Sequence, residues 1–277
     1  MKNLLKITLL ITAIILFNSC KKEETLTEET NQNKFPEIKA KLDKMYFNTT
    51  NLEKIDFELP DGTTQEMFLV EDDIMFSREQ IQNMTQPENY DNLENNRQYR
   101  TWNLVNPGTI NIIGYTGGSY GLSSKERTAL QWAINNYNRL NLSIRFNLTF
   151  GTNYSSKDMV VYHNPNGSGS GGSAGFPSNG KPNKYVQIYG LNSYDTNVVE
   201  HVLTHEIGHS VGFRHTDWFS RQSCGQNANE GTGSDGAVHI PGTPTGFDAT
   251  SIMVACFGPN EDGEFNANDI TALNYLY

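Results

Sequence analysis

Several short runs in the second half of the chain alternate apolar and polar side chains, the pattern of strands that have one face in a core. The first run covers Thr109 to Tyr115 and follows Pro107-Gly108, a pair typical of turns. Three further runs have strand character: Leu142 to Phe150, Met159 to Tyr162, and Tyr185 to Tyr189. The pattern predicts a sheet built from this part of the chain.

Helices are predicted on either side of the later strands. Ser123 and Glu126 have the spacing of a capping box, in which each side chain bonds the other's backbone N–H. Apolar residues then recur at helical spacing as far as Leu140, namely Leu130, Ile134 and Tyr137. A second helix is predicted to begin near Thr196 or Asn197. The resulting order is strand, helix, strands, helix.

Two glycine-containing segments between the regular elements have a weaker pattern. Residues 166–175 are rich in glycine and serine but lack the strand-to-helix context of a nucleotide-binding loop, so we expect a mobile loop. Asn260 to Gly263 resembles part of a calcium loop, yet Gly258 stands where the first acidic ligand belongs. We therefore expect a turn there, followed by a final helix from Asp269 to Leu276 capped by Asn268.

Three of the six histidines lie in the stretch HEIGHSVGFRH. His205 and His209 are four residues apart, so a helix places both imidazoles on one face, at a spacing that suits one small metal ion. Glu206 is offset round the helix and can reach a water on that ion. Gly212 allows the helix to stop and the chain to reverse, which brings His215 back. Three imidazoles with an open fourth position indicate a catalytic zinc site.

These residues form the pattern HExxHxxGxxH, which resembles the zinc-binding consensus of the metzincin endopeptidases. Ser251-Ile252-Met253 resembles the metzincin Met-turn, in which Met253 lies beneath the zinc ligands. The residues HEIGH and the lipoprotein-like leader resemble the dual-action HEIGH metallopeptidases, which have the astacins as relatives. The resemblance covers about the last two-thirds of the chain. The sequence departs from astacins at Thr216 and at Ala255, where they have a glutamate and a zinc-contacting tyrosine.

The resemblance implies an α+β fold of the metzincin type, with a mixed twisted sheet, two long helices, the Met-turn and a C-terminal helix. It also implies an endopeptidase with one catalytic zinc held by His205, His209 and His215. Glu206 would act as general base toward the zinc-bound water. Protein or peptide substrates and a monomeric state are expected. His201 shares the ligand face but lies too far from His209 to bind the same ion, so we expect a hydrogen-bonded or surface histidine.

Three alternatives to the metzincin hypothesis remain at this point. The zinc could be structural, although a structural site needs neither Glu206 nor an open position. A gluzincin would take a downstream glutamate as third ligand, and the pair Gly212 and His215 argues against that. The third alternative is a surface-anchored binding or adhesion lipoprotein with a relict zinc site, which hydrolysis abolished by a chelator would exclude.

The N-terminus has the features of a lipoprotein leader. Lys2 and Lys6 precede the apolar run Leu9 to Phe17, which is too short to span a bilayer. The sequence FNSC at its end resembles a bacterial lipobox, which makes residues 1–19 a signal peptide and Cys20 the lipid attachment site. We expect an exported lipoprotein of the outer membrane and cell surface, held to the membrane by this lipid only. The KKEE sequence that follows is either an export tag or a solvated tether.

Composition and charge define the remaining organisation. The chain has 277 residues, of which 36% are hydrophobic, enough for a sizeable core. Its net charge is −10 and no basic patch stands out, so phosphate-driven nucleic-acid binding has no electrostatic support and we expect no nucleic-acid partner. We assign residues 20–100 to an acidic tether and propeptide-like region, and residues 101–277 to the zinc metallopeptidase domain.

The cysteines fit an exported protein. If Cys20 carries lipid, only Cys224 and Cys256 remain, and an oxidising compartment favours a disulfide between them. Such a bond would connect the segment after the zinc motif to the Met-turn.

An acidic stretch before the peptidase domain suggests how the enzyme is kept inactive. The sequence VEDDI, which ends at Ile74, resembles the astacin propeptide motif FxGDI, whose aspartate occupies the open zinc position. The resemblance makes Asp73 a candidate zymogen block, because a carboxylate is a competent zinc ligand. Cleavage near Arg97 to Thr101 would then free the zinc and release the domain from its anchor. The alternative is a solvated acidic cluster.

Overall fold

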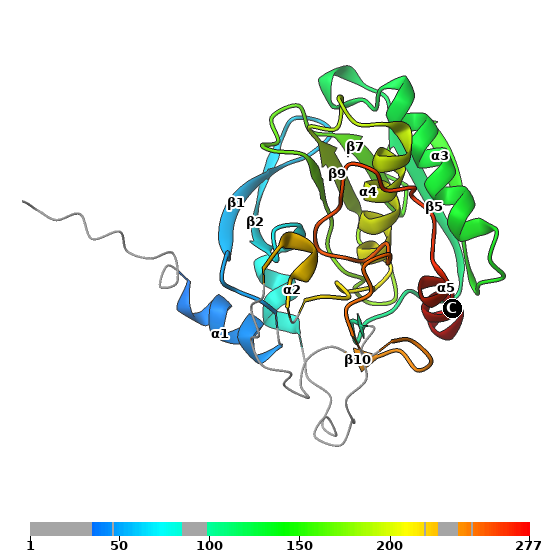
Figure 1. Ribbon diagram of the computed structural model, residues 1–277. Helices are drawn as coiled ribbons and strands as arrows, with labels where there is room; N and C mark the ends of the chain where they lie inside the picture. Colours follow the sequence, from blue (N-terminus) through cyan, green and yellow to red (C-terminus); the bar gives the residue numbers. More distant parts are fainter. Residues whose placement is uncertain (1–34, 46, 85–98, 219, 227–237, 245) are drawn as a thin grey trace, which may run out of the picture. The chain divides into compact units, whose positions relative to one another are not determined.

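The computed structural model describes residues 35–45, 47–84, 99–218, 220–226, 238–244 and 246–277 (Figure 1). The predicted signal peptide, Cys20 and Arg97 of the predicted processing segment lie outside these residues. None of the helices in the described ranges combines the length and the apolar character that a membrane span requires.

A five-stranded sheet supports the histidine-bearing helix. The strand order is β6-β5-β7-β9-β8, in which the first four strands run parallel and β8 is antiparallel to β9. The strands are β5 (Gly108–Tyr115), β6 (Ile144–Gly151), β7 (Met159–His163), β8 (Gly171–Ser173) and β9 (Tyr185–Tyr189). The four strands predicted from alternation are confirmed, and the sheet is mixed.

Residues 166–175 are not wholly a loop, because Gly171–Ser173 forms strand β8 at the edge of the sheet. Gly171 pairs with Tyr189 and Ser173 with Gln187. A glycine-rich segment has no side-chain alternation, so the periodic pattern could not detect this strand. The prediction of a mobile loop was wrong for these residues.

Two helices of equal length, α3 (Ser124–Asn138) and α4 (Thr196–Ser210), pack against one face of this sheet. In Figure 1 they run beside each other in front of the strands. Ser123 caps α3 through the predicted capping box with Glu126, and α4 begins at the predicted position. The core between helices and sheet contains side chains from every layer, among them Ile112, Leu130, Val161, Val186 and Leu203.

A second, smaller sheet from the N-terminal region covers the other face. It contains β1 (Glu53–Glu58), β2 (Thr64–Val70) and β3 (Ile74–Phe76), all antiparallel, with the helices α1 (Pro36–Lys44) and α2 (Arg78–Asn83). Alternation along β5 explains the two cores: Ile112 faces the helices, whereas its neighbour Ile113 packs against the N-terminal sheet. The central sheet is therefore buried on both faces.

The C-terminal helix α5 covers Ala267–Leu276. Its N-cap is Asn266, whose side chain accepts hydrogen bonds from the backbone N–H groups of Asn268 and Asp269. The prediction that Asn268 caps this helix was wrong by two residues, because Asn266 and Asp269 form the capping box instead. Within the described residues, the other short elements are β4 (Tyr99–Arg100), which pairs with β10 (Val238–His239), and the 3₁₀ turns η3 (Gly118–Tyr120) and η4 (Gln222–Cys224). The predicted α+β class is confirmed.

Candidate active site

Helix α4 and the turn after it bring the three histidines of the HEIGH stretch together. His205 and His209 lie one helical turn apart, so their imidazoles leave the same face of the helix. Gly212 has φ +113°, a backbone conformation that L side chains rarely adopt, and the chain reverses there. The reversal places His215 beside the other two, with ring centroids 4.7 Å from His209 and 5.2 Å from His205.

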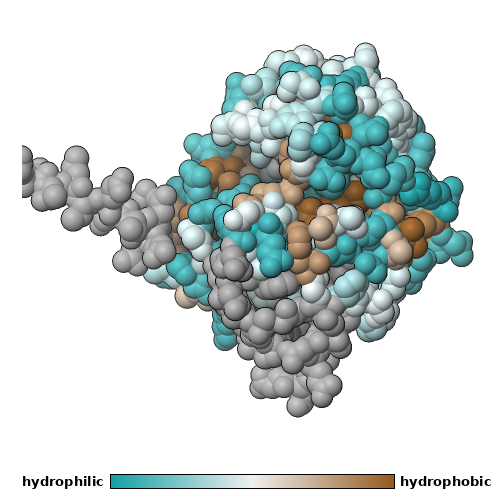
Figure 2. Space-filling view, viewed as in Figure 1, coloured by the Kyte–Doolittle hydropathy of each residue, from teal (hydrophilic) through white to brown (hydrophobic). Residues whose placement is uncertain are grey.

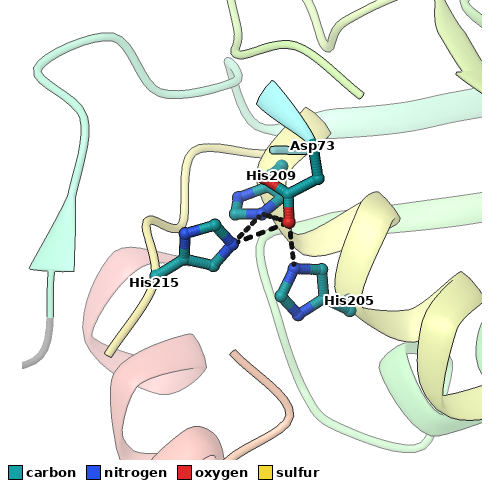
Figure 3. A group of neighbouring side chains, drawn as sticks. All are labelled: Asp73, His205, His209 and His215. Carbon is teal, nitrogen blue, oxygen red and sulfur yellow. Dashed lines mark hydrogen bonds and ion pairs between the residues drawn. The ribbon is translucent and has the colours of Figure 1, made fainter. Parts of the chain in front are cut away.

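The three imidazoles converge on one carboxylate oxygen from the N-terminal region (Figure 3). Oδ2 of Asp73 lies 2.9 Å from Nε2 of His215 and 3.4 Å from Nε2 of His205. The distance from the same oxygen to Nε2 of His209 is 3.9 Å. The four ligand atoms all lie within 4.8 Å of one another. Sequence segments more than a hundred residues apart thus meet at one point.

Hydrogen bonds at Nδ1 of His205 and His209 determine which ring nitrogen is available as a ligand. Nδ1 of His205 lies 2.8 Å from the carbonyl oxygen of Ile252, and Nδ1 of His209 lies 2.7 Å from that of Phe213. A carbonyl oxygen only accepts, so both rings carry their proton on Nδ1. The lone pairs of Nε2 therefore point into the cluster, as metal-binding histidines require.

The chemistry of the donor set fits a divalent metal ion. Nε2 of His209 and Nε2 of His215 are only 3.1 Å apart. At this distance the two nitrogens either share one proton in a hydrogen bond or bind one cation that lies between them. Asp73 adds a negative charge at the same point, and its Oδ1 has no hydrogen-bond partner within the described residues. Three imidazoles and a carboxylate match the ligand types of a four-coordinate site.

Glu206 points into the same site from the next position on α4 but is not one of the four converging ligands. Its side chain is buried, and Oε2 has no hydrogen-bond partner in the part of the chain that the structure describes. Burial, together with the nearby Asp73 carboxylate, raises the pKa of Glu206 well above its usual range. A buried carboxyl group with a raised pKa, next to a group of candidate metal ligands, has the properties of a proton acceptor and donor.

Strand β8 comes unusually close to this glutamate. A Cβ atom on Gly172 would lie 2.6 Å from Cγ of Glu206 and 2.8 Å from its Oε1. Glycine is therefore required at this position for the edge strand and Glu206 to lie side by side.

The predicted Met-turn lies against α4 and is tied to α5. Met253 packs on the helix at Gly208, where a Cβ atom would be 2.6 Å from the methionine sulfur. The carboxylate of Asp269 accepts a 2.6 Å hydrogen bond from the Ser251 hydroxyl and a 3.1 Å bond from the N–H of Ile252. Since the carbonyl of Ile252 orients His205, this turn connects the C-terminal helix to a ligand of the cluster.

The predicted disulfide between Cys224 and Cys256 is present, with a Cα–Cα distance of 5.1 Å. It joins η4 to the segment that follows the Met-turn. Asp217 braces the same region, because its carboxylate accepts hydrogen bonds from the N–H of Ala255 at 2.8 Å and from the Ser223 hydroxyl at 2.6 Å.

Asp73 belongs to a tight acidic turn between β2 and β3, which we call the acidic tip and define as Glu71, Asp72 and Asp73. Glu71 has φ 55° and Asp72 has φ 71°, both in the left-handed region that costs energy for residues other than glycine. Each carboxylate of the acidic tip has its own partner. Asp73 meets the histidines, Asp72 forms a 2.6 Å ion pair with Arg221, and Glu71 forms a 2.8 Å ion pair with Arg214.

Glu71 also holds the third histidine. Its Oε2 lies 3.2 Å from Nδ1 of His215, and its Oε1 accepts from the backbone N–H of Asn48 at 3.0 Å. Burial raises the pKa of Glu71, but Arg214 and His215 outweigh this effect and lower the pKa to about 2. Sequence reasoning missed Glu71, Arg214 and Arg221. The sequence indicated these residues only through their charge. Two acidic residues directly precede Asp73, and Arg214 directly precedes His215.

A cavity of about 330 Å³ opens beside Glu206 and His205. Its walls are largely apolar and aromatic, and include Tyr189, Tyr194, Val202, Val254 and Phe257. On the face drawn in Figure 2, the hydrophobic residues gather in a recessed band across the middle.

His201 also lines this cavity. It is buried and its Nε2 has no partner among the described residues, so the expectation of a hydrogen-bonded or surface histidine was wrong.

Over residues 68–277, more than half of its length, the chain matches the family described as dual-action HEIGH metallo-peptidase. The chain belongs to this family. Two solved structures of myroilysin are similar to it, with TM-scores of 0.38 and 0.37 and sequence identities of 14% and 15%. Both cover 60% of this chain, and the matches cover 78% and 81% of those chains. No curated protein matches the sequence.

Membership of the dual-action HEIGH family makes the chain a metallopeptidase, a hydrolase of peptide bonds in proteins or peptides. The predicted family, enzyme class and metzincin-type fold are thereby confirmed. The acidic tip lies inside the region that matches the family, because that region begins at residue 68.

Proposed function

We propose that this chain is a zinc endopeptidase made in a latent form, in which Asp73 fills the metal position that the catalytic water needs. The observation that carries the proposal is the convergence of three histidine Nε2 atoms on Oδ2 of Asp73. Zinc is the ion we expect, because imidazole nitrogen with one carboxylate oxygen at tetrahedral sites suits it well. His205, His209 and His215 would hold the ion in both the latent and the active form.

Glu206 would serve as general base and then as general acid. Zinc bound by the three histidines would polarise the scissile carbonyl and lower the pKa of the attacking water. Glu206 would take the proton from that water and deliver it to the leaving nitrogen. Burial supports the first step, since desolvation raises the pKa of Glu206 and so makes its carboxylate a stronger base toward the proton of the bound water.

Latency is supported by the backbone of the acidic tip as well as by Asp73. The carbonyl of Asp73 accepts from the N–H of Ala174 at 3.0 Å, and the N–H of Met75 donates to the carbonyl of Ala174 at 2.7 Å. These bonds continue β8, the edge strand that borders Glu206. These backbone bonds hold the acidic tip beside Glu206 and so keep the Asp73 carboxylate at the metal position.

The lipid anchor and the cleavage that releases the peptidase domain are proposed from the sequence alone. We propose that the signal peptide is removed at Cys20, that lipid on this residue holds the chain at the outer membrane and cell surface, and that the chain is a monomer. Cleavage near Arg97 to Thr101 would then separate residues 101–277 from the anchor. A lipidated Cys20 predicts that Cys20→Ser abolishes partition into detergent; unchanged partition of this variant would contradict the anchor.

The function is tested by hydrolysis and metal content measured on the same preparation. The full-length chain, cut between residues 85 and 101 after folding and diluted until the fragments separate, should hydrolyse an unstructured protein substrate. A chelator should abolish this activity, and zinc should restore it. The rival hypothesis, a binding or adhesion lipoprotein with a relict site, predicts no hydrolysis by the cut, zinc-loaded chain.

A further inference from the structure

Arg221 is held in an unusual backbone conformation beside the active site. It precedes η4 with φ 47°, in the left-handed region, and its N–H donates to the carbonyl of Asp217 at 2.7 Å. The carbonyl of Arg221 accepts in turn from the N–H of Cys224 at 3.0 Å, next to the disulfide. The backbone that carries this guanidinium is therefore fixed by the catalytic part of the chain and not by the acidic tip.

The Arg221 side chain is only 5% exposed, and its partners come from the acidic tip. Nη2 forms a 2.6 Å ion pair with Oδ2 of Asp72, and Nη1 donates to the carbonyl of Glu71 at 3.4 Å. Asp72 is its one carboxylate partner within the described part of the chain. Removal of the acidic tip would leave this guanidinium without its anion and facing the cavity, where another anion could take the place of Asp72.

The position of Arg221 indicates what that anion would be. Arg221 lines the same cavity as His205 and Glu206, so its guanidinium faces the place where a substrate would be cleaved. Asp72 is the immediate neighbour of Asp73, whose carboxylate occupies the cluster of histidines. In a bound substrate, the residue whose carboxylate Arg221 binds would therefore lie close in sequence to the peptide group that occupies the metal position.

Arg214, the other arginine paired with the acidic tip, does not meet this condition. Its side chain is 1% exposed, and it lies over the ring of Phe47 at 4.2 Å. It does not line the cavity that contains Glu206. Of the two arginines, Arg221 is the one whose guanidinium a bound peptide could reach.

We infer that Arg221 is a specificity-determining residue. In the processed enzyme it binds the side-chain carboxylate of an aspartate or glutamate that lies within two positions of the cleaved bond. The acidic tip occupies this subsite with Asp72 in the latent chain and so imitates the preferred substrate. Arginine suits the role because its planar guanidinium binds a carboxylate through two parallel hydrogen bonds. This inference rests on the proposed peptidase function and specifies its substrate class.

The test uses the full-length chain, folded, loaded with zinc and then cut between residues 85 and 101, with the fragments diluted until they separate. Cleavage sites in a peptide library are identified by mass spectrometry. Two peptides that differ only by Asp or Asn at the selected position then give a ratio of kcat/KM values. We expect this ratio to be about tenfold or more for the wild type, and to fall close to one in Arg221→Gln.

Two further variants make the result specific. Arg221→Lys keeps the charge and should retain part of the preference for Asp. Arg145→Gln removes an exposed arginine from β6, at the opposite edge of the sheet from β8, and should leave the ratio unchanged. Formation of the Cys224–Cys256 disulfide and the thermal unfolding midpoint show whether each variant is folded.

The outcomes separate the two proposals. Hydrolysis without a preference for Asp over Asn, or a preference that survives in folded Arg221→Gln, would overturn the role of Arg221 and leave the peptidase function intact. If the cut and zinc-loaded wild type hydrolyses no peptide, the peptidase function fails and the subsite fails with it.

Discussion

At the scale of single residues, the glycine in the middle of HEIGH has a packing reason. A Cβ atom at Gly208 would lie 2.6 Å from the sulfur of Met253 and 3.3 Å from the hydroxyl of Tyr137. Both distances are shorter than ordinary van der Waals contact, so a methyl group there must displace the Met-turn. The HEIGH sequence therefore depends on a methionine that lies far along the chain.

We predict that Gly208→Ala lowers the free energy of unfolding by about 1 kcal/mol, because overpacking of about 1–3 kcal/mol outweighs the helix propensity that alanine gains. Denaturant unfolding measures this. Gly151→Ala is the control, since its nearest side-chain atom is 3.7 Å away. Equal stability of the two variants would show that Met253 does not restrict this position.

A second residue-scale prediction separates base from ligand. Glu206→Ala should keep its zinc, because Glu206 is not among the converging ligand atoms, yet lose at least about a hundredfold in kcat. His205→Ala should lose both zinc and activity. Metal analysis and peptide turnover on the same samples decide the matter. A Glu206→Ala protein without zinc, or with near-full activity, would contradict the assignment.

The residues of the site differ in how far they could be predicted. The three histidines and Glu206 were predictable because one helix and one turn fix their geometry within eleven residues of sequence. Asp73 was accessible only through a motif resemblance. Glu71 and Arg214 could not be paired in advance, because 143 residues separate them and no periodic pattern reports a contact of that kind. Only the fold brings them together.

At the scale of elements, helix α5 stabilises the site through a single carboxyl group. Asp269 is buried and accepts hydrogen bonds from the Met-turn, whose Ile252 orients His205. Burial raises the pKa of Asp269 from its ordinary 3.8 to about 6. Its protonated form therefore favours the folded state, and that contribution is lost as the pH rises through the folded-state pKa.

We expect the stability difference between the wild type and Asp269→Asn to depend on pH in this direction. From about pH 4 to pH 6 the wild type should lose up to about 3 kcal/mol of unfolding free energy relative to the variant. Denaturant unfolding of both proteins at several pH values measures the difference, in which the other carboxyl groups cancel. A difference that stays constant, or grows with pH, would contradict a raised pKa.

Strand β8 shows why some elements escaped prediction. Its sequence Gly-Gly-Ser has no apolar side chain to alternate, and it forms a strand because its backbone pairs with β9 on one side. The four parallel strands of the same sheet were predictable because apolar and aromatic side chains recur along them. An edge strand that pairs through its backbone alone produces no alternation of apolar and polar residues in the sequence.

At the scale of the whole molecule, the N-terminal sheet is a structural layer as well as a block. Phe57 and Met67 from this sheet pack against Ile113, Val160 and Tyr162 of the central sheet. The second face of the central sheet would lose this cover if residues 101–277 were separated from the preceding region. The same region that closes the active site thus shields apolar side chains.

Residues 101–277, prepared alone, should therefore unfold at a temperature several degrees below that of the full chain. They should also bind more of a dye that reports exposed apolar surface. The full-length chain cut between residues 85 and 101, with its fragments kept together, is the control and should match the uncut chain. Equal unfolding temperatures for the isolated domain and the full chain would show that the N-terminal sheet adds no stability.

In the uncut chain, we propose, Asp73 keeps a zinc peptidase inactive. The most direct measurement is hydrolysis of a short peptide by three uncut, zinc-loaded proteins: wild type, Asp73→Ala, and Asp56→Ala, which removes an exposed aspartate from β1. We predict that Asp73→Ala hydrolyses the peptide in a chelator-sensitive manner while the other two do not. The claim is contradicted if Asp73→Ala is as inactive as the wild type while the cut chain is active, or if the uncut wild type is already fully active.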